Sequence, residues 1–411
     1  MTAALSLRGR LGGLVWWIAA RPNWIYLVAV PALVAMVTRM AATFGGHYLD
    51  LEVYRLGVHA WLSGGDIYGI LPVTSAGVVL PFIYPPLAAL VMVPLTVLSW
   101  PVAAILMFAL SLSALVATLY LVARRLWPRA APRTMLAVTS LMVAPALLLE
   151  PVSQTFSFGQ INLVLMAMVA ADCLIDRPRW PRGLLVGLAA AIKLTPAVFV
   201  LYFLLRRDYR AAFGTLLGAA AGTAVGALVA PGPSLHYWTG GLAGASGVSG
   251  SPFFTNQTFQ AVLVRAGIDG LPMKALWLLL SAGLLLLAAP AIRRGPRALA
   301  MVVTAGVGLL VSPTSWSHHW VWIAPGLLVV AVLAWRARSW RWALAGAVLA
   351  VSFVMAPFHQ LPHDNNRELT WSAAQQTVGA SYVIVTVAVY LLLWHSWRRR
   401  TQSSLVRSAQ V

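Results

Sequence analysis

The stretch PVAAILMFALSLSALVATLYLVA, residues 101–123, carries no charged side chain and is followed directly by Arg124 and Arg125. A helix needs about 20 mostly apolar residues to cross the hydrocarbon core of a bilayer. This stretch is therefore predicted to be a transmembrane helix. Nine further apolar runs are predicted to be helices of the same kind: 24–42, 134–149, 160–175, 210–230, 272–292, 298–312, 318–335, 341–356 and 378–397.

The composition of the whole chain agrees with this prediction. Of its 411 residues, 60% are hydrophobic and 9% are charged, whereas soluble domains carry about 25% charged residues. The single cysteine, Cys173, lies inside an apolar run, which excludes a disulfide framework and a cysteine-ligated metal site. We therefore predict one polytopic, all-α integral membrane domain over residues 1–411, located in the cell membrane.

The net charge of +19 comes mainly from short arginine clusters between apolar runs. That distribution is typical of cytoplasmic loops under the positive-inside rule. It predicts membrane lipids rather than nucleic acid as the surroundings of these residues, with contact to anionic lipids as a secondary role. The clusters are Arg8/Arg10/Arg21, Arg124/Arg125/Arg129/Arg133, Arg206/Arg207/Arg210, Arg293/Arg294/Arg297, Arg336/Arg338/Arg341 and Arg398/Arg399/Arg400.

The same clusters orient the chain. Residues 43–84 and 231–271 are predicted to be the first and second large extracytoplasmic loops, with 313–319 and 357–377 on the same side.

Two stretches in the middle, 85–99 and 183–205, leave two topologies open. If 85–99 is re-entrant and 183–205 is a broken hairpin with Lys193 near the outer surface, the basic loops 124–133 and 176–182 stay in the cytoplasm. If both stretches are ordinary spans, those loops move outside. The first version is favoured, and either version gives about twelve membrane segments.

The polar residues that could carry chemistry gather on the predicted outer side. In GGHYLDLEVYRLG, residues 45–57, Asp50 and Glu52 follow the first span. A carboxylate there can take a proton from a hydroxyl nucleophile or hold a cation. Alternatively, Asp50 can be the N-cap of a helix. Residues 53–62 are predicted to form a helix lying on the membrane surface.

Two further motifs follow along the chain. In IYPP, the Pro85–Pro86 pair favours a helix start, and Tyr84 is interpreted as an interface anchor. In SFGQINLVL, Gly159 permits close backbone approach. Gln160 and Asn162 present amide groups that suit sugar hydroxyls or, alternatively, bond neighbouring helices.

A lysine and a histidine pair complete the set. Lys193 interrupts an apolar run in AAIKLTP, and its ammonium can bind a lipid phosphate or, alternatively, snorkel to the surface. In SPTSWSHHWVW, His318 and His319 stand between Trp316 and Trp320. Adjacent helical side chains diverge by about 100°. We therefore expect one histidine to face the site, with His319 the deeper of the two, and disfavour joint metal ligation.

Taken in order, D-x-x-VY, YPP, GQ-x-N, KLTP and SP-x-SW-x-HH resemble motifs of the actinobacterial polyprenyl-phosphate-mannose-dependent mannosyltransferases of the GT-C superfamily, glycosyltransferase family 87. The resemblance covers residues 45–325, and within the family it is strongest to the phosphatidylinositol mannoside α-1,2-mannosyltransferases. It implies a GT-C type bundle of about 12 transmembrane helices, whose extracytoplasmic loops form the active site.

The resemblance also implies the chemistry. The donor is polyprenyl phosphate mannose, the acceptor is a mannose hydroxyl of a glycolipid, and no metal or nucleotide cofactor takes part. Asp50 matches the position of the family's general base, although Glu52 beside it departs from the single-acid motif. Lys193 and His318 are expected to bind the donor phosphate, with His318 and His319 as further catalytic candidates. Sugar and acceptor binding is expected at Glu52, Tyr54, Gln160, Asn162, Trp316 and Trp320.

The implied donor is β-linked and the implied product α-linked, so the reaction inverts, which needs one base opposite the leaving phosphate. Two alternatives remain open. One is a sister mannosyltransferase or arabinosyltransferase acting on lipomannan or lipoarabinomannan. The other is a lipid or sugar transporter, which the gathering of polar residues on one side disfavours.

Overall fold

The computed structural model describes residues 23–43, 48–241 and 250–408, and in these ranges the regular structure is helical apart from one isolated bridge between Asn256 and Trp316. The helices are α2 (Asn23–Thr43), α3 (Leu49–Leu62), α4 (Pro86–Val97), α5 (Trp100–Leu126), α6 (Pro132–Ala146), α7 (Glu150–Phe158), α8 (Asn162–Leu174), α9 (Leu184–Ile192), η1 (Thr195–Val198), α10 (Phe199–Leu205), α11 (Tyr209–Val229), α12 (Pro231–His236), η2 (Tyr237–Gly241), α14 (Phe259–Arg265), α15 (Gly270–Arg294), α16 (Arg297–Val311), η4 (Ser317–Trp322), α17 (Ile323–Ala337), α18 (Trp340–Met355), η5 (Pro357–Gln360), η6 (Arg367–Thr370), α19 (Ala373–Gly379) and α20 (Ser381–Ser408).

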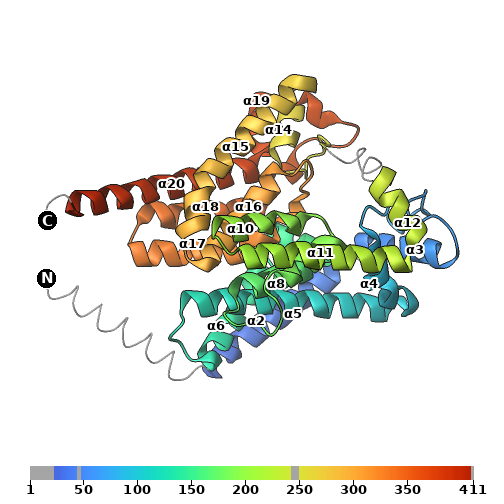
Figure 1. The fold of residues 1–411 in the computed structure, drawn as a ribbon, viewed down its shortest axis with the longest axis horizontal. Coiled ribbons are helices and arrows are strands. Elements are labelled where there is room, and N and C mark those ends of the chain that lie inside the picture. The colour runs from blue at the N-terminus through green and yellow to red at the C-terminus, as the bar shows by residue number, and fades with distance from the viewer. Residues whose placement is uncertain (1–22, 44–47, 242–249, 409–411) are drawn as a thin grey trace.

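Six of these helical segments are long and apolar enough to cross a membrane, and two bent pairs would raise the number to eight. The predicted all-helical, multi-pass membrane protein is confirmed. The predicted count of about twelve is not, because α4, α8, α16 and the η1–α10 segment are too short to cross a bilayer core alone. Figure 1 shows the long helices lying side by side, with α3, α4 and α12 gathered at one end and the end of α20 at the other.

The bend of the chain at Lys193 resolves one of the two ambiguous stretches. Helix α9 packs along α11, with Gly183 against Ala211 at one end and Ala191 against Gly222 further along. The backbone is extended at Lys193, which ends α9. Arg206, which directly follows α10, donates to the carbonyl of Gly295 at 2.9 Å. Gly295 lies in the basic loop between α15 and α16, so η1 and α10 lead back to the end of the bundle that carries the basic loops. Residues 183–205 therefore form the predicted broken hairpin.

Helix α4 resolves the other ambiguous stretch. It begins at Pro86, as predicted. Both of its flanks contact α3, because Phe82 lies against Gly57 and Arg55 donates to the carbonyls of Leu95 and Leu98 at 2.5 and 2.9 Å. A stretch that starts and ends beside the same helix does not cross the bundle, so residues 85–99 turn back as the favoured topology predicts.

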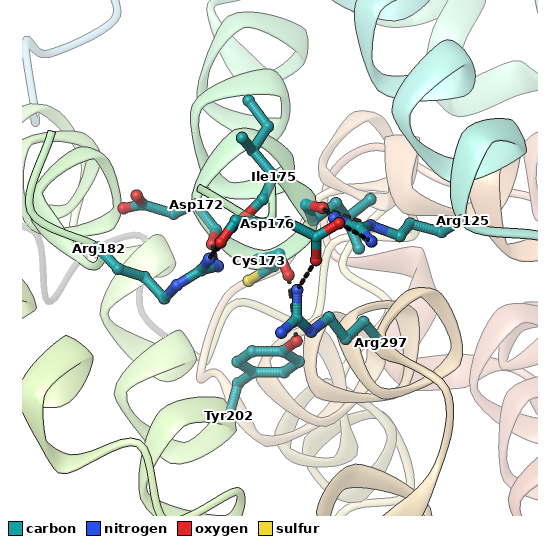
Figure 2. Close-up of polar contacts among 9 residues, drawn as sticks. Arg125, Asp172, Cys173, Ile175, Asp176, Arg182, Tyr202 and Arg297 are labelled. Carbon is teal, nitrogen blue, oxygen red and sulfur yellow. Dashed lines mark hydrogen bonds and ion pairs between the residues drawn. The ribbon is translucent and has the colours of Figure 1, made fainter. Parts of the chain in front are cut away.

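Three basic loops meet at the end of α8 in a cluster that we call the arginine clamp, made of Arg125, Asp176, Arg182 and Arg297 (Figure 2). Asp176 accepts from Arg125 and Arg297, each at 2.7 Å. Arg182 donates to the carbonyls of Ile175 and Asp176 at 2.6 and 2.8 Å. The loops 124–133, 176–182 and 293–297 therefore lie at one end of the bundle, as the positive-inside prediction requires. The predicted N-terminal cluster at Arg8, Arg10 and Arg21 lies outside the described residues.

Candidate active site

Asp50 lies in the first turn of α3. The helix begins at Leu49 and its N-cap is Tyr48, in the left-handed region with φ 31°, so the alternative that Asp50 is the N-cap is wrong. Residues 45–47 of this motif lie outside the described part of the chain. Asp50 is half-buried, and Tyr54 one turn later is fully buried on the same face. This face of α3 points toward the end of α7.

The end of α7 carries the GQ-x-N motif. Gly159 adopts φ 65° and ends the helix, and a Cβ at this position would stand 2.8 Å from the Cβ of Leu51. Only glycine permits that approach, so the predicted close backbone contact is confirmed. It brings the next residue, Gln160, against α3, where Tyr54 donates to its Oε1 at 2.5 Å.

Tyr84 belongs to the same network, so the interpretation of this residue as an interface anchor is wrong. Its side chain is buried, with 6% exposed. Its hydroxyl accepts from the Nε2 of Gln160 at 3.0 Å and lies 3.2 Å from the hydroxyl oxygen of Tyr54. The YPP motif therefore supplies a polar wall of the site in addition to starting α4.

Lys193 stands at the centre of the polar residues. Its side chain is 8% exposed. Its Nζ donates to Asn162 Oδ1 at 2.8 Å, lies 3.2 Å from His319 Nε2, and is 5.3 Å from the ring centre of Tyr84. Among the described residues Lys193 forms no ion pair with a carboxylate. A buried ammonium held by neutral groups keeps its charge available for an anion.

The two histidines have different surroundings, as predicted. His319 faces Lys193, and an ammonium that donates to its Nε2 leaves the neutral imidazole with its proton on Nδ1. His318 packs edge-to-face on Phe158, and its carbonyl accepts from Thr155 at 3.0 Å and from Asn162 at 2.9 Å. His318 is buried and His319 is half-buried, and His319 is the one of the pair that contacts Lys193.

Electrostatic coupling links Asp50 to Lys193. Burial raises the pKa of Asp50 to about 6, and the Lys193 charge and the Gln160 side chain oppose that rise. Burial lowers the pKa of Lys193 to about 8, and the Asp50 charge opposes that fall. Each of the two charges therefore favours the ionised form of the other. A carboxyl group whose pKa is near the working pH is suited to act as a general base.

Three of the predicted site residues are not brought to Lys193. Glu52 lies on the opposite face of α3 and accepts from the backbone and side chain of Ser75. Trp320 is buried, and its ring centre lies 5.8 Å from the ring centres of both Phe353 and Tyr382. Trp316 is half-buried and bridges to Asn256, in the second predicted outer loop.

A supporting network around Glu150 was not predicted from the sequence. Glu150 starts α7, is 9% exposed, and accepts from Ser317 at 2.7 Å, His359 at 2.8 Å and Tyr382 at 3.0 Å. The bond to Ser317 fixes the residue directly before the histidine pair. A signal was present, because Glu150 is a lone carboxylate directly after the apolar run ALLL.

A cavity of about 50 Å³ lies beside His319, lined also by Asn162, Ser315 and Thr195. It has room for one or two water molecules, which each occupy about 30 Å³. His319 Nδ1 and Ser315 Oγ have no hydrogen-bond partner among the described residues. Within the same ranges, no three His, Cys, Asp or Glu side chains lie close enough together to hold a metal ion.

Comparisons with known proteins show the family to which the chain is similar. A model of glycosyltransferase family 87 matches residues 82–313. A polyprenol-phosphate-mannose-dependent α-(1-2)-phosphatidylinositol mannoside mannosyltransferase of Mycolicibacterium smegmatis is 42% identical over 368 residues, which cover 84% of this chain and 83% of the relative. The protein of the same name from Mycobacterium tuberculosis is 39% identical over 425 residues, which cover 98% and 97%. Among solved structures, ArnT from Cupriavidus metallidurans bound to undecaprenyl phosphate is similar with a TM-score of 0.34 and 14% identity, covering 90% of this chain and 77% of ArnT.

Proposed function

Because this chain belongs to glycosyltransferase family 87, we propose that it transfers mannose from a polyprenyl phosphate carrier to a mannose hydroxyl of a phosphatidylinositol mannoside, forming an α-1,2 linkage. The observation that carries this proposal is the position of Lys193. This buried ammonium is held by neutral groups, and Asp50 is close enough for its charge to act on it. A cation and a carboxylate facing one space are what transfer from a phosphate leaving group needs.

Lys193 is proposed to bind the phosphate of the donor. The bond between the mannose C1 and the phosphate oxygen breaks during transfer, and negative charge builds up on that oxygen. An ammonium and an imidazole N–H at fixed positions stabilise this charge without reorganisation. Asn162 fixes Lys193, and it also fixes the histidine segment through the His318 carbonyl.

Asp50 is proposed to be the general base. Its carboxylate takes the proton of the acceptor hydroxyl while that oxygen attacks C1 of the donor mannose on the face opposite the phosphate. The polyprenyl phosphate leaves as an anion and the configuration at C1 inverts. The leaving phosphate needs no proton, so a second acid is unnecessary. The half-buried position of Asp50, beside Gln160 and within electrostatic reach of Lys193, supports this assignment.

The remaining polar groups are proposed to orient the sugars. Gln160 and Tyr54 present an amide and a hydroxyl next to Asp50, and sugar hydroxyls can both donate to and accept from such groups. Trp316 is proposed to form one wall of the site where the acceptor binds. Its backbone bridge to Asn256 connects the histidine segment to the second predicted loop. Glu52 has no part in this set.

The site is proposed to face the extracytoplasmic side of the membrane. Asn162 begins α8 and the arginine clamp lies just after its end, so the helix separates the two regions by about 20 Å. Arginine-rich loops stay in the cytoplasm. The opposite end of the bundle, which carries Asp50 and Lys193, then lies outside.

The direct test is reconstitution of the purified chain in lipid vesicles with radiolabelled polyprenyl phosphate mannose and a phosphatidylinositol mannoside acceptor. We expect label in a lipid product that an α-1,2-specific mannosidase releases. Release of label by the enzyme without transfer, or transfer only from a nucleotide sugar, would refute the proposal.

A further inference from the structure

Helix α3 carries a second polar face, directed away from Asp50. Glu52, Arg55, Leu56 and His59 recur at the three- and four-residue spacing that aligns side chains on one side of a helix. Asp50 and Tyr54 lie on the other side, toward Gln160. One short helix therefore presents two separate sets of polar side chains.

This second face borders a cavity of about 390 Å³, lined by Glu52, Arg55, Leu56, His59, Ser75, Thr96 and Trp100. Sites for small molecules typically measure about 300–1,000 Å³. The cavity beside His319 measures about 50 Å³ by the same measure. The cavity on the far side of α3 is thus large enough for a sugar residue, and we call it the α3 cavity.

The charged groups of the α3 cavity are held in place by other parts of the chain. Glu52 accepts from the backbone N–H and the hydroxyl of Ser75 at 2.9 and 2.7 Å. Arg55 donates from Nη1 to Leu95 and Leu98, and its guanidinium stands 5.6 Å from the ring centre of Trp100. Groups fixed in this way lose little side-chain freedom when a ligand binds, which favours binding.

The chemistry of the lining selects a neutral, hydroxyl-rich ligand. The Glu52 carboxylate accepts hydrogen bonds, the Arg55 guanidinium donates them, and the Trp100 indole offers apolar surface for a sugar ring. A carboxylate in the wall opposes a phosphate by like-charge repulsion. The combination therefore fits a glycan better than a lipid headgroup phosphate.

We propose that the α3 cavity is a second glycan subsite, which binds mannose residues of the acceptor that lie beyond the one receiving the new sugar. This inference rests on the proposed function. An α-helix with its side chains is about 10 Å across, which is more than the length of one hexose ring. An acceptor with a single mannose at Asp50 therefore does not reach the cavity, whereas one with several mannoses does. The cavity selects for longer acceptors.

The test compares two acceptors, a lipid with one mannose and a lipid with several, on the wild-type chain and on Glu52→Gln and His59→Ala. Glu52→Gln is expected to raise KM for the longer acceptor by about tenfold, because it weakens a hydrogen bond to a charged group, and His59→Ala by about fivefold, because it removes an ordinary hydrogen bond. Kinetics with the single-mannose acceptor should not change. His59 is exposed, so His59→Ala tests the cavity even where Glu52→Gln disturbs the loop around Ser75. Leu62→Ala, an exposed change on α3 away from the cavity, is the matched control.

Equal effects on both acceptors, or none on either, would overturn the proposal. If the wild-type chain transfers no mannose to either acceptor, the proposed function fails and a binding measurement decides the subsite. Titration calorimetry with a free mannose oligosaccharide should then show binding to the wild-type chain and weaker binding to His59→Ala. Equal binding by both proteins, or no binding, would also refute the proposal that the α3 cavity is a glycan subsite.

Discussion

The two ends of α8 carry polar clusters that use charge in opposite ways. After the end of the helix, Asp176 is paired with both Arg125 and Arg297 at 2.7 Å, and these hydrogen bonds, chiefly from Arg125, hold the pKa of Asp176 below its usual value (Figure 2). At the start of the helix, the ammonium of Lys193 is bonded to the neutral side chains of Asn162 and His319.

This difference separates a structural cluster from a candidate binding site. Ions that are paired within the chain have their partners already, and they tie loops together. The Lys193 ammonium has no direct carboxylate contact among the described residues, and the Asp50 charge acts on it only at longer range, so an anion that binds beside it stabilises the buried charge further. The arginine clamp therefore has a structural role, because its ion pairs connect three loops. The surroundings of Lys193 are suited to bind a substrate phosphate.

The largest effect is expected from Asp50→Asn, which removes the proposed base and keeps the shape of the side chain. Loss of a general base costs about 10²–10⁴ in rate. Initial rates of mannose transfer, measured on protein that elutes as the wild type does, check this. The control is Asp66→Asn, an exposed carboxylate in the same loop, which should transfer at the wild-type rate. Wild-type turnover by Asp50→Asn would remove Asp50 from the mechanism.

The second effect in size is expected from Lys193→Ala. Removal of one group that stabilises the leaving charge costs about 10²–10³ in rate. The loss should appear in kcat/KM for the polyprenyl phosphate mannose donor, while KM for the acceptor changes little. The chain's other lysine, Lys274, is exposed on α15, so Lys274→Ala is the matched control. Unchanged donor kinetics in Lys193→Ala would mean that Lys193, like the arginine clamp, has only a structural role.

A smaller effect is expected from the histidines, and it should be unequal. His319→Ala removes the side chain that touches Lys193 and should lower kcat/KM for the donor by about tenfold, the value of a hydrogen bond to a charged group. His318→Ala keeps the backbone carbonyl that accepts hydrogen bonds from Thr155 and Asn162, so the decrease in kcat/KM should be smaller. Parallel assays with a chelator complete the test. Equal loss in both variants, with inhibition by the chelator that a divalent ion reverses, would indicate a metal site instead.

The smallest effect is expected from Asp176→Asn in the arginine clamp. Exposed ion pairs contribute about 0–1 kcal/mol each, and the Asp176 side chain is 66% exposed. The thermal midpoint should fall by a few degrees, while kcat and both KM values stay at the wild-type level. A loss of transfer activity in folded Asp176→Asn protein would mean that the clamp takes part in the reaction.

Much of the fold could be predicted from the sequence because long apolar runs indicate membrane-spanning helices and arginine clusters indicate which loops lie in the cytoplasm. The broken hairpin at Lys193 was predictable since the positive-inside rule required both of its ends on one side. The bend of 82° between α6 and α7 was not predicted, and Glu150, which starts α7, bonds there to partners from three distant segments that the local sequence does not reveal.

The site was predictable in part, for a related physical reason. Asp50, Gln160, Asn162, Lys193 and His319 stand out as polar residues in apolar surroundings, and the structure brings them together. Tyr84 was misinterpreted because a tyrosine near a span is usually an interface anchor. Glu52 and Asp50 are two residues apart, and only the observed start of α3 at Leu49 shows that they lie on opposite faces.

The most direct test of the central claim is the pH dependence of kcat/KM for donor transfer in the wild type and in Lys193→Arg. Transfer needs an ionised Asp50, so the rate should fall as pH drops below about 6. It also needs a charged Lys193, so the wild-type rate should fall as pH rises above about 8. Arginine stays protonated throughout this range. Lys193→Arg, where active, should therefore keep the acidic limb and lose the alkaline one. An alkaline limb that is identical in both proteins would contradict the assignment of Lys193 as the phosphate-binding cation.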